Sequence, residues 1–277
     1  MASQKRLLGV FAHPDDETFG SGGTLARYVS EGVDITVVCA TRGEVGEITL
    51  GSKATPETLG AVREAEIRLA LNVLGVQSLV ILGYRDSGMM GSEDNKNPSA
   101  FINVPISEVI ERLVEIIRKC RPHVMVTMDP SGGYGHPDHI RVAELTTHAF
   151  KVAGDPSFMS RCAEELWSPN KLYYHVFPRS RLIHWLKYIQ ETDPSRDIAR
   201  LNPNTLGTAD DEITTVLDVS NFVELKIHAA QHHRSQRSPF TILPQDLMRE
   251  VLCKDFWLRI EPHWDGGEVE TDMFAGL

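Results

Sequence analysis

The sequence predicts an α/β fold: a Rossmann-like, mostly parallel sheet flanked by helices, with a smaller C-terminal extension. Three observations predict this class. Short apolar runs rich in β-branched residues alternate with segments of helical periodicity through the first half of the chain. The runs are continuously apolar, as in strands that are buried on both faces of a parallel sheet. The second half is less regular, which indicates additions to one core.

The first half is expected to hold four buried strands with helices between them. The strands are LLGVFA (7–12), DITVVCA (34–40), SLVILG (78–83) and HVMVTM (123–128). The helices are 23–32, where Gly32 ends the helix, 56–75 and 106–120. Alternation of this kind predicts right-handed crossovers between parallel strands, with helices covering the sheet.

The second half adds strands at 171–177, 213–219 and 255–262 and a helix at 221–234. Residues 178–212 are charged and contain prolines, and they show few strand signals. We expect a solvated connection there, or a loop-rich insertion near a pocket.

Composition excludes several classes of protein. The 277 residues carry a formal net charge of −10, so a nucleic-acid partner is not expected. No run of about 18 apolar residues occurs, and the apolar stretch near the N-terminus is too short for a signal peptide, which predicts a cytoplasmic protein without a membrane segment. The four cysteines are far apart and form no CxxC pair, so we expect them to be reduced.

One pattern occurs twice. FAHPDDETFG (11–20) follows the first expected strand directly, and GYGHPDHIRV (133–142) follows the fourth by a few residues. In an open parallel sheet the loops at the carboxyl ends of the strands converge on one edge, where ligands bind. We therefore expect the two His-Pro-Asp loops to meet in space and to form one site.

The two loops carry the side chains that divalent metals prefer. Candidate ligands are His13, Asp15, Asp16, Glu17, His136, Asp138 and His139. Two imidazoles with one carboxylate suit Zn²⁺, and a catalytic zinc keeps a position open for water. The spacing alone leaves a closed, four-ligand structural site open. Against it, an acid such as Asp15 beside a metal is costly unless it serves as a base.

On these motifs the chain resembles the PIG-L/LmbE-like zinc N-deacetylases. This family includes the deacetylases of mycothiol and bacillithiol biosynthesis and of the glycosylphosphatidylinositol pathway. Further matches are RGEVGE (42–47), Arg63 in VREAE, GYRDSGM (83–89) and KIHAAQHHRSQ (226–236). The resemblance spans roughly residues 6–236, in order.

The resemblance implies a role for each matching residue. His13, Asp16 and His139 would bind Zn²⁺, with Fe²⁺ or another divalent metal as alternatives. The catalytic residues would be Asp15 as general base, His136 as an imidazolium that stabilises the oxyanion, Tyr134 near the substrate carbonyl, and Asp138 holding a histidine in one tautomer. Whether Asp15 or His136 protonates the leaving amine stays open.

The same resemblance implies a substrate and the residues that contact it. The partner would be a small N-acetylated sugar derivative, bound by Glu47, Arg63, Asp86 and His233. For Arg63 an ion pair on a helix surface is an equal alternative, and for Asp86 a plain turn residue. A homo-oligomer is possible.

Residues 1–170 would then be the Rossmann-like catalytic core, and residues 171–277 would complete the sheet and the substrate pocket, either within the same domain or as a small lobe. The expected reaction is removal of an N-acetyl group from an amino sugar or glycoconjugate. The alternatives are an amidase for a larger amide, such as a thiol conjugate or an antibiotic glycoside, and a zinc-binding protein without turnover.

Other patterns in the sequence do not support a different site. FGSGGT (19–24) lacks the third glycine of a dinucleotide fingerprint, and no GxSxG elbow occurs. His228 and His232 have helical spacing, but no glutamate of the zincin pattern lies between them, so we expect a solvated helix face.

Overall fold

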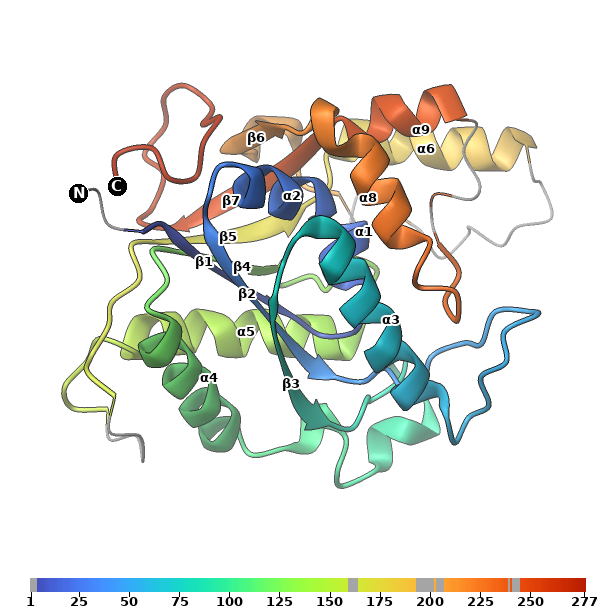
Figure 1. The fold of residues 1–277 in the computed structure, drawn as a ribbon, viewed down its shortest axis with the longest axis horizontal. Helices are drawn as coiled ribbons and strands as arrows, with labels where there is room; N and C mark the ends of the chain where they lie inside the picture. The colour runs from blue at the N-terminus through green and yellow to red at the C-terminus, as the bar shows by residue number, and fades with distance from the viewer. Residues whose placement is uncertain (1–3, 159–163, 193–201, 203–206, 239, 241–244) are drawn as a thin grey trace.

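The computed structural model describes residues 4–158, 164–192, 202, 207–238, 240 and 245–277. Its described strands form one seven-stranded sheet in the order β3-β2-β1-β4-β5-β7-β6 (Figure 1). The strand bounds are β1 Arg6–Phe11, β2 Asp34–Thr41, β3 Ser78–Tyr84, β4 Val124–Met128, β5 Lys171–Val176, β6 Thr215–Asp218 and β7 Lys254–Glu261. The predicted α/β fold with a mostly parallel sheet is confirmed.

The first five strands are parallel, and the order reverses between β1 and β4. β1 pairs with β2 on one side and with β4 on the other, in register from Leu7 opposite Val124. The strands that precede the two His-Pro-Asp loops are therefore neighbours. Their carboxyl ends meet at the position where ligands bind in such sheets.

The last two strands extend the sheet in the antiparallel direction. β7 pairs with β5 and with β6, so the C-terminal part of the chain continues the sheet of the first half. The assignment of residues 1–170 and 171–277 to separate functional parts stays a prediction.

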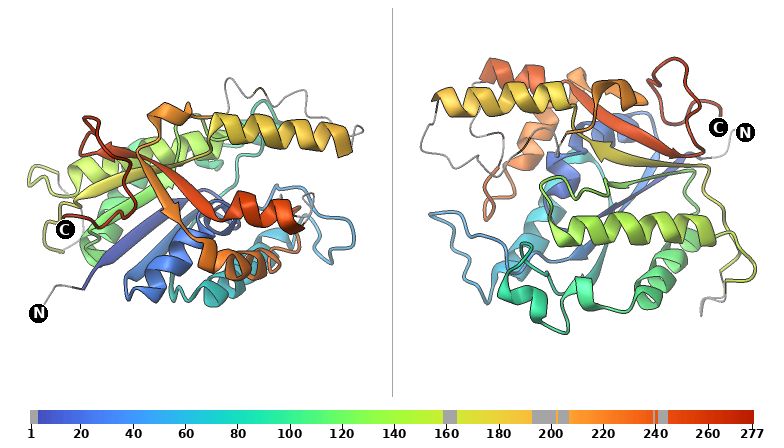
Figure 2. Two further views of the ribbon diagram at one scale, coloured as in Figure 1. Left: turned by 90° about the horizontal axis from the view of Figure 1, so that it is seen from above. Right: turned by 180° about the vertical axis from the view of Figure 1, so that it is seen from behind.

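Helices cover both faces of the sheet (Figure 2). Their bounds are α1 Asp16–Phe19, α2 Gly22–Ser30, α3 Leu59–Leu74, α4 Ile106–Cys120, α5 Pro137–Val152, α6 Arg179–Thr192, α8 Val223–Ala230 and α9 Gln245–Leu252. α2, α3 and α8 pack together on one face, and α4 and α5 on the other. No described helix is both long enough and apolar enough to cross a membrane.

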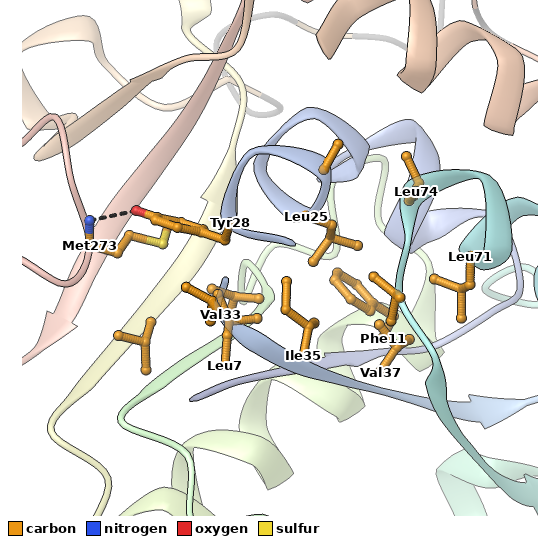
Figure 3. Packing of buried hydrophobic residues seen from close by; sticks show 14 of the residues in the cluster. Leu7, Phe11, Leu25, Tyr28, Val33, Ile35, Val37, Leu71, Leu74 and Met273 are labelled. Atoms are coloured by element: carbon orange, nitrogen blue, oxygen red, sulfur yellow. Dashed lines mark hydrogen bonds between the residues drawn. The ribbon is translucent and has the colours of Figure 1, made fainter. Parts of the chain in front are cut away.

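Two apolar clusters hold these layers together. The cluster under α2 and α3 includes Phe11, Leu25 and Leu71, all of them nearly inaccessible to solvent (Figure 3). Tyr28 closes this cluster, and its hydroxyl accepts a hydrogen bond of 2.7 Å from the backbone N–H of Met273. The C-terminal segment is thereby attached to the first crossover helix.

The region 178–212 differs from the expected connection because it begins with a helix. α6 buries Leu182, Leu186 and Ile189, which recur at spacings of four and three residues. This apolar stripe is a helical signal that the surrounding charged residues obscured. Residues 193–201 and 203–206 lie outside the described residues.

Three of the four cysteines, Cys39, Cys120 and Cys253, are free thiols, as expected. Cys162 lies outside the described residues.

Candidate active site

The first His-Pro-Asp loop leaves β1 and turns at once into the short helix α1. Asp15 is the residue before that helix, with φ 125° and ψ −29°. A non-glycine residue at this φ is strained, and such strain is typical of functional sites. The backbone N–H of His13 donates to Asp16 Oδ2 at 2.8 Å, which fixes the carboxylate next to the ring.

The second loop ends at the N-terminus of α5, so the four residues of HPDH occupy its first turn. His136 is the N-cap, Pro137 takes the first helical position, and Asp138 and His139 follow. Proline suits that position because its missing N–H would have no partner there. The helix thus presents two imidazoles and a carboxylate at its positive end.

The two loops bring three donor groups together. His13 Nδ1 lies 3.1 Å from His139 Nε2. Asp16 Oδ1 lies 3.3 Å from His139 Nε2, and Asp16 Oδ2 lies 3.5 Å from His13 Nδ1. Ligands at about 2.0–2.2 Å from a tetrahedral ion stand roughly 3.3–3.6 Å apart. The spacing of these donors therefore fits one small divalent ion.

A second layer of carboxylates orients His13. Asp138 Oδ2 accepts from His13 Nε2 at 3.2 Å and from the backbone N–H of Ser87 at 3.0 Å. Asp86 Oδ1 lies 3.6 Å from the same ring nitrogen. Burial lowers the pKa of His13, but Asp86, Asp138 and Asp16 outweigh it and raise the pKa well above the ordinary value. With the proton held on Nε2, Nδ1 is left to bind a metal.

His136 lies beside the three donor residues His13, Asp16 and His139. Together with His13 and His139 it forms a set whose nitrogens lie within 4.8 Å of one another. Its Nδ1 accepts the backbone N–H of Asp138 at 3.2 Å, which leaves the proton on Nε2. Burial and the two other imidazoles lower the pKa of His136 to about 3. These causes favour the neutral ring, which can donate a hydrogen bond through Nε2, and the role of His136 as an imidazolium stays a prediction.

Asp15 is next to the metal-ligand group and pairs with a buried arginine. Arg63 places its Nη2 3.2 Å from Asp15 Oδ2, and the same nitrogen donates to the carbonyl of Pro14 at 2.7 Å. Burial raises the pKa of Asp15 to about 6, although the positive charge of Arg63 opposes the change. A carboxylate with such a pKa is suited to general-base chemistry near neutral pH.

The glycines of the β2–α3 loop make room for this arginine. Gly43 has φ 62°, and a Cβ at that position would lie 2.2 Å from Arg63 Nη1. The carbonyl of Gly43 accepts from the same nitrogen at 3.0 Å. Any side chain at residue 43 would displace the guanidinium that faces Asp15.

A cavity of about 510 Å³ opens in front of the site. Asp15, Asp16 and His139 lie in its wall, and the half-exposed ring of Tyr134 lies at its rim with its centroid 5.3 Å from that of His139. The wall is largely apolar. Its apolar lining residues include Phe19, Phe177, Trp185, Phe240, Leu252 and Phe256.

The four expected substrate contacts lie in different places. Glu47 is exposed and lines the cavity. Arg63 and Asp86 are buried behind Asp15 and His13, and neither lines the cavity. His233 is 1% exposed and contacts Glu17. Their roles in substrate binding stay predictions, and for three of them the structure shows contacts within the protein instead.

The structure adds polar residues of the wall that sequence reasoning missed. Lys226 and Asp255 form a buried ion pair at 2.9 Å that lines the cavity, and His175 lies beside it at the end of β5. The spacing of His175 and Asp255 gave no signal, whereas Lys226 begins the matching segment 226–236. His175 could have been found because it ends a strand at the carboxyl edge of the sheet.

Known proteins match this chain over both His-Pro-Asp loops. A family model described as "PIG-L: GlcNAc-PI de-N-acetylase" matches residues 8–150. A 1D-myo-inositol 2-acetamido-2-deoxy-alpha-D-glucopyranoside deacetylase from Rhodococcus erythropolis is 42% identical over 299 aligned positions, which cover 100% of this chain and 99% of the relative. The relative therefore matches the C-terminal part as well as the two motif loops.

Solved structures show the same fold at lower identity. N,N'-diacetylchitobiose deacetylase from Pyrococcus horikoshii matches with a TM-score of 0.64 and 22% identity, over 93% of this chain and 84% of that chain. A 4-carboxy-2-hydroxymuconate hydratase from Pseudomonas putida KT2440 matches with a TM-score of 0.62 and 17% identity, over 96% and 100%. Since a deacetylase and a hydratase share this fold, the activity has to be argued from the residues of the site.

Proposed function

Since the chain belongs to the PIG-L family of de-N-acetylases, we propose that it hydrolyses the N-acetyl group of an N-acetylglucosaminyl inositol with Zn²⁺ as its metal. Its relative from Rhodococcus erythropolis is named for 1D-myo-inositol 2-acetamido-2-deoxy-alpha-D-glucopyranoside, and this compound is our candidate substrate. A cytoplasmic location and a homo-oligomer stay predictions.

The observation that carries the proposal is the position of Asp15 in the cavity wall, next to the converging donors of His13, Asp16 and His139. We assign the last three residues to the metal. The Nε2 of His139 is the nitrogen that faces His13 Nδ1 and Asp16 Oδ1, so we take it as the ligand atom. When bound there, a divalent ion supplies a Lewis acid for the amide carbonyl and lowers the pKa of a nearby water.

The protein's own groups then move protons and stabilise charge. Asp15 accepts the proton of the attacking water and returns it to the leaving amine. His136 donates its Nε2–H to the developing oxyanion, and the N-terminus of α5 favours the same negative charge. Because the pKa of His136 is about 3, the ring is not protonated near neutral pH, which favours Asp15 as the acid of the second step.

The apolar wall supports a second candidate substrate. Phe177, Trp185 and Phe240 line the same cavity as Asp15, Asp16 and His139. An N-acetylglucosaminide with an apolar substituent would bury that substituent against these rings. The corresponding activity is hydrolysis of the amide bond of a larger substrate, such as a thiol conjugate or an antibiotic glycoside.

The test is release of free amine by the zinc-loaded protein. We expect release from the N-acetylglucosaminyl inositol, its loss on chelation, and a fall of several orders of magnitude in kcat for Asp15→Asn. An N-acetylglucosaminide with an aromatic aglycone tests the second candidate under the same conditions. Absence of amine release from every N-acetylated sugar by protein with a full complement of zinc would reject the proposal.

A further inference from the structure

Glu17 is a fully buried carboxylate that lies behind the Asp15 loop. Its side chain is 0% exposed, and it does not line the cavity of the active site. Its Oε2 accepts the backbone N–H of Asp15 at 2.9 Å. The sequence placed Glu17 among the candidate metal ligands, but the carboxylate is engaged with the backbone of the neighbouring loop.

The backbone that Glu17 holds is the strained one. Asp15 has φ 125°, a conformation that costs about 1–3 kcal/mol and persists only where surrounding contacts enforce it. The carbonyl of Asp15 accepts from the N–H groups of Thr18 and Phe19 at 3.0 and 2.8 Å, as the first turn of α1 requires. The N–H of the same residue depends on a side chain, which is Glu17.

His233 and the hydroxyl of Thr18 both contact the other oxygen of this carboxylate. Its Nε2 lies 3.1 Å from Glu17 Oε1, and both side chains are 0% exposed. The remaining ring nitrogen, Nδ1, has no partner among the described residues. His233 follows α8, more than two hundred residues from Glu17 in sequence, and a buried carboxylate needs such a partner to be tolerated.

We propose that Glu17 and His233 are a positioning pair that holds Asp15 in its strained conformation and so aims its carboxylate at the reacting water. Neither residue touches the substrate. This inference rests on the proposed role of Asp15 as the base. It replaces substrate contact as the function of His233, whose ring is closed off from the cavity that holds Asp15.

The central experiment compares Glu17→Ala with Glu17→Gln. We expect Glu17→Ala to lower kcat about 100-fold, because a shift of about 1 Å in a reacting group has an effect of that size, with KM and zinc content unchanged. In the metal-free protein, the amide hydrogen of Asp15 should exchange at least tenfold faster. Glu17→Gln keeps a carbonyl oxygen for the Asp15 N–H and should retain kcat within about tenfold.

His233→Ala tests the second member of the pair. It should lower kcat and accelerate exchange of the Asp15 amide in the same direction as Glu17→Ala, but by less. Because the two residues act through one contact, the double variant should be no slower than Glu17→Ala alone.

Glu66 provides a matched control. It is also a buried carboxylate that holds the segment after α8, since its oxygens accept the N–H and the hydroxyl of Ser235 at 2.8 and 2.6 Å. It makes no contact with Asp15. Glu66→Ala should lower the melting temperature while leaving kcat and the exchange of the Asp15 amide unchanged.

Unchanged kcat and unchanged Asp15 exchange in folded Glu17→Ala would overturn the inference, as would an equal loss of kcat in Glu66→Ala. If Glu17→Ala does not fold, His233→Ala decides by the same two measurements. Exchange is measured without metal or substrate, so it tests the positioning even if the proposed substrate is wrong. Full activity in Asp15→Asn would instead reject the proposed function.

Discussion

Among the residues of the site, the carboxyl group of Asp15 is the one whose ionisation should set the pH dependence of the reaction. The pKa of this group is raised to about 6 by burial, and Arg63 opposes the rise. A base has to be ionised to accept a proton, so activity should increase as the pH rises through the pKa of Asp15. Loss of a nearby positive charge would raise that pKa further.

Arg63→Met should therefore move the acidic limb of kcat/KM to higher pH, by about one pH unit or more, as is usual when a carboxylate loses a neighbouring positive charge. A bound metal ion lowers the pKa of Asp15 in both proteins, so the direction of the difference stays the same. Arg68→Ala is the control, because Arg68 lies on the same helix and is exposed, where it pairs with Glu64. An acidic limb at the same pH in Arg63→Met and in the unaltered protein would contradict this role for Arg63.

The sequence predicted most of the residues that lie in the site. It predicted less well which groups their side chains contact. Arg63 matched a substrate position, yet its side chain lies behind Asp15. A signal for this was present: Leu59, Arg63, Ile67 and Ala70 share one helical face, and a charge on an apolar face is usually paired inside the protein. His233 gave no such signal, because its partner Glu17 is remote in the chain and only the fold brings them together.

At the scale of elements, the first turn of α5 supplies His139 to the metal and Asp138 to the orientation of His13. We expect Asp138→Asn to weaken zinc binding about 10–100-fold, because the carboxamide orients the His13 ring less firmly. The measurement is competition with a zinc chelator of known affinity. Glu144→Gln, an exposed change on the same helix, should leave the affinity unchanged. Equal affinities in the two variants would contradict the role given to Asp138.

The elements themselves were predictable to different degrees. The strands β1, β2 and β4 are buried runs of consecutive apolar residues, and the alternating helices identified them as parallel. β3 was also expected to be buried, but it lies at the edge of the sheet and is only partly buried. The helix α6 was missed because its stripe of Leu182, Leu186 and Ile189 is embedded among charged residues. The antiparallel direction of β7 was not predictable, because it depends on how the chain returns to β5 rather than on local composition.

At the scale of the whole molecule, Glu270 attaches the C-terminal segment to the sheet. Its carboxylate accepts from Lys171, Tyr173, Thr215 and Arg259 at 2.8–3.1 Å. Burial raises the pKa of Glu270, but the hydrogen bonds from Thr215, Lys171 and Tyr173 outweigh it and the pKa is lowered. Since the folded pKa lies below the unfolded one, this stabilisation is present above the unfolded pKa and is lost as pH falls.

Glu270→Gln should accordingly reduce the free energy of unfolding at pH 7 by on the order of 2 kcal/mol. The difference from the unaltered protein should shrink as the pH falls below about 4, where the carboxylate of the unaltered protein becomes protonated. Urea unfolding at several pH values measures both effects. Glu268→Gln, an exposed change nearby, is the control, and a loss of stability that is independent of pH would contradict the account.

The central claim is that two loops more than one hundred residues apart hold a single divalent ion, and zinc content per chain tests it most directly. We predict one zinc per chain in the unaltered protein, none in His139→Ala, and one in His136→Ala, which should lose turnover instead. Loss of zinc from both variants would indicate a closed, four-ligand site, and a full zinc content in His139→Ala would contradict the claim.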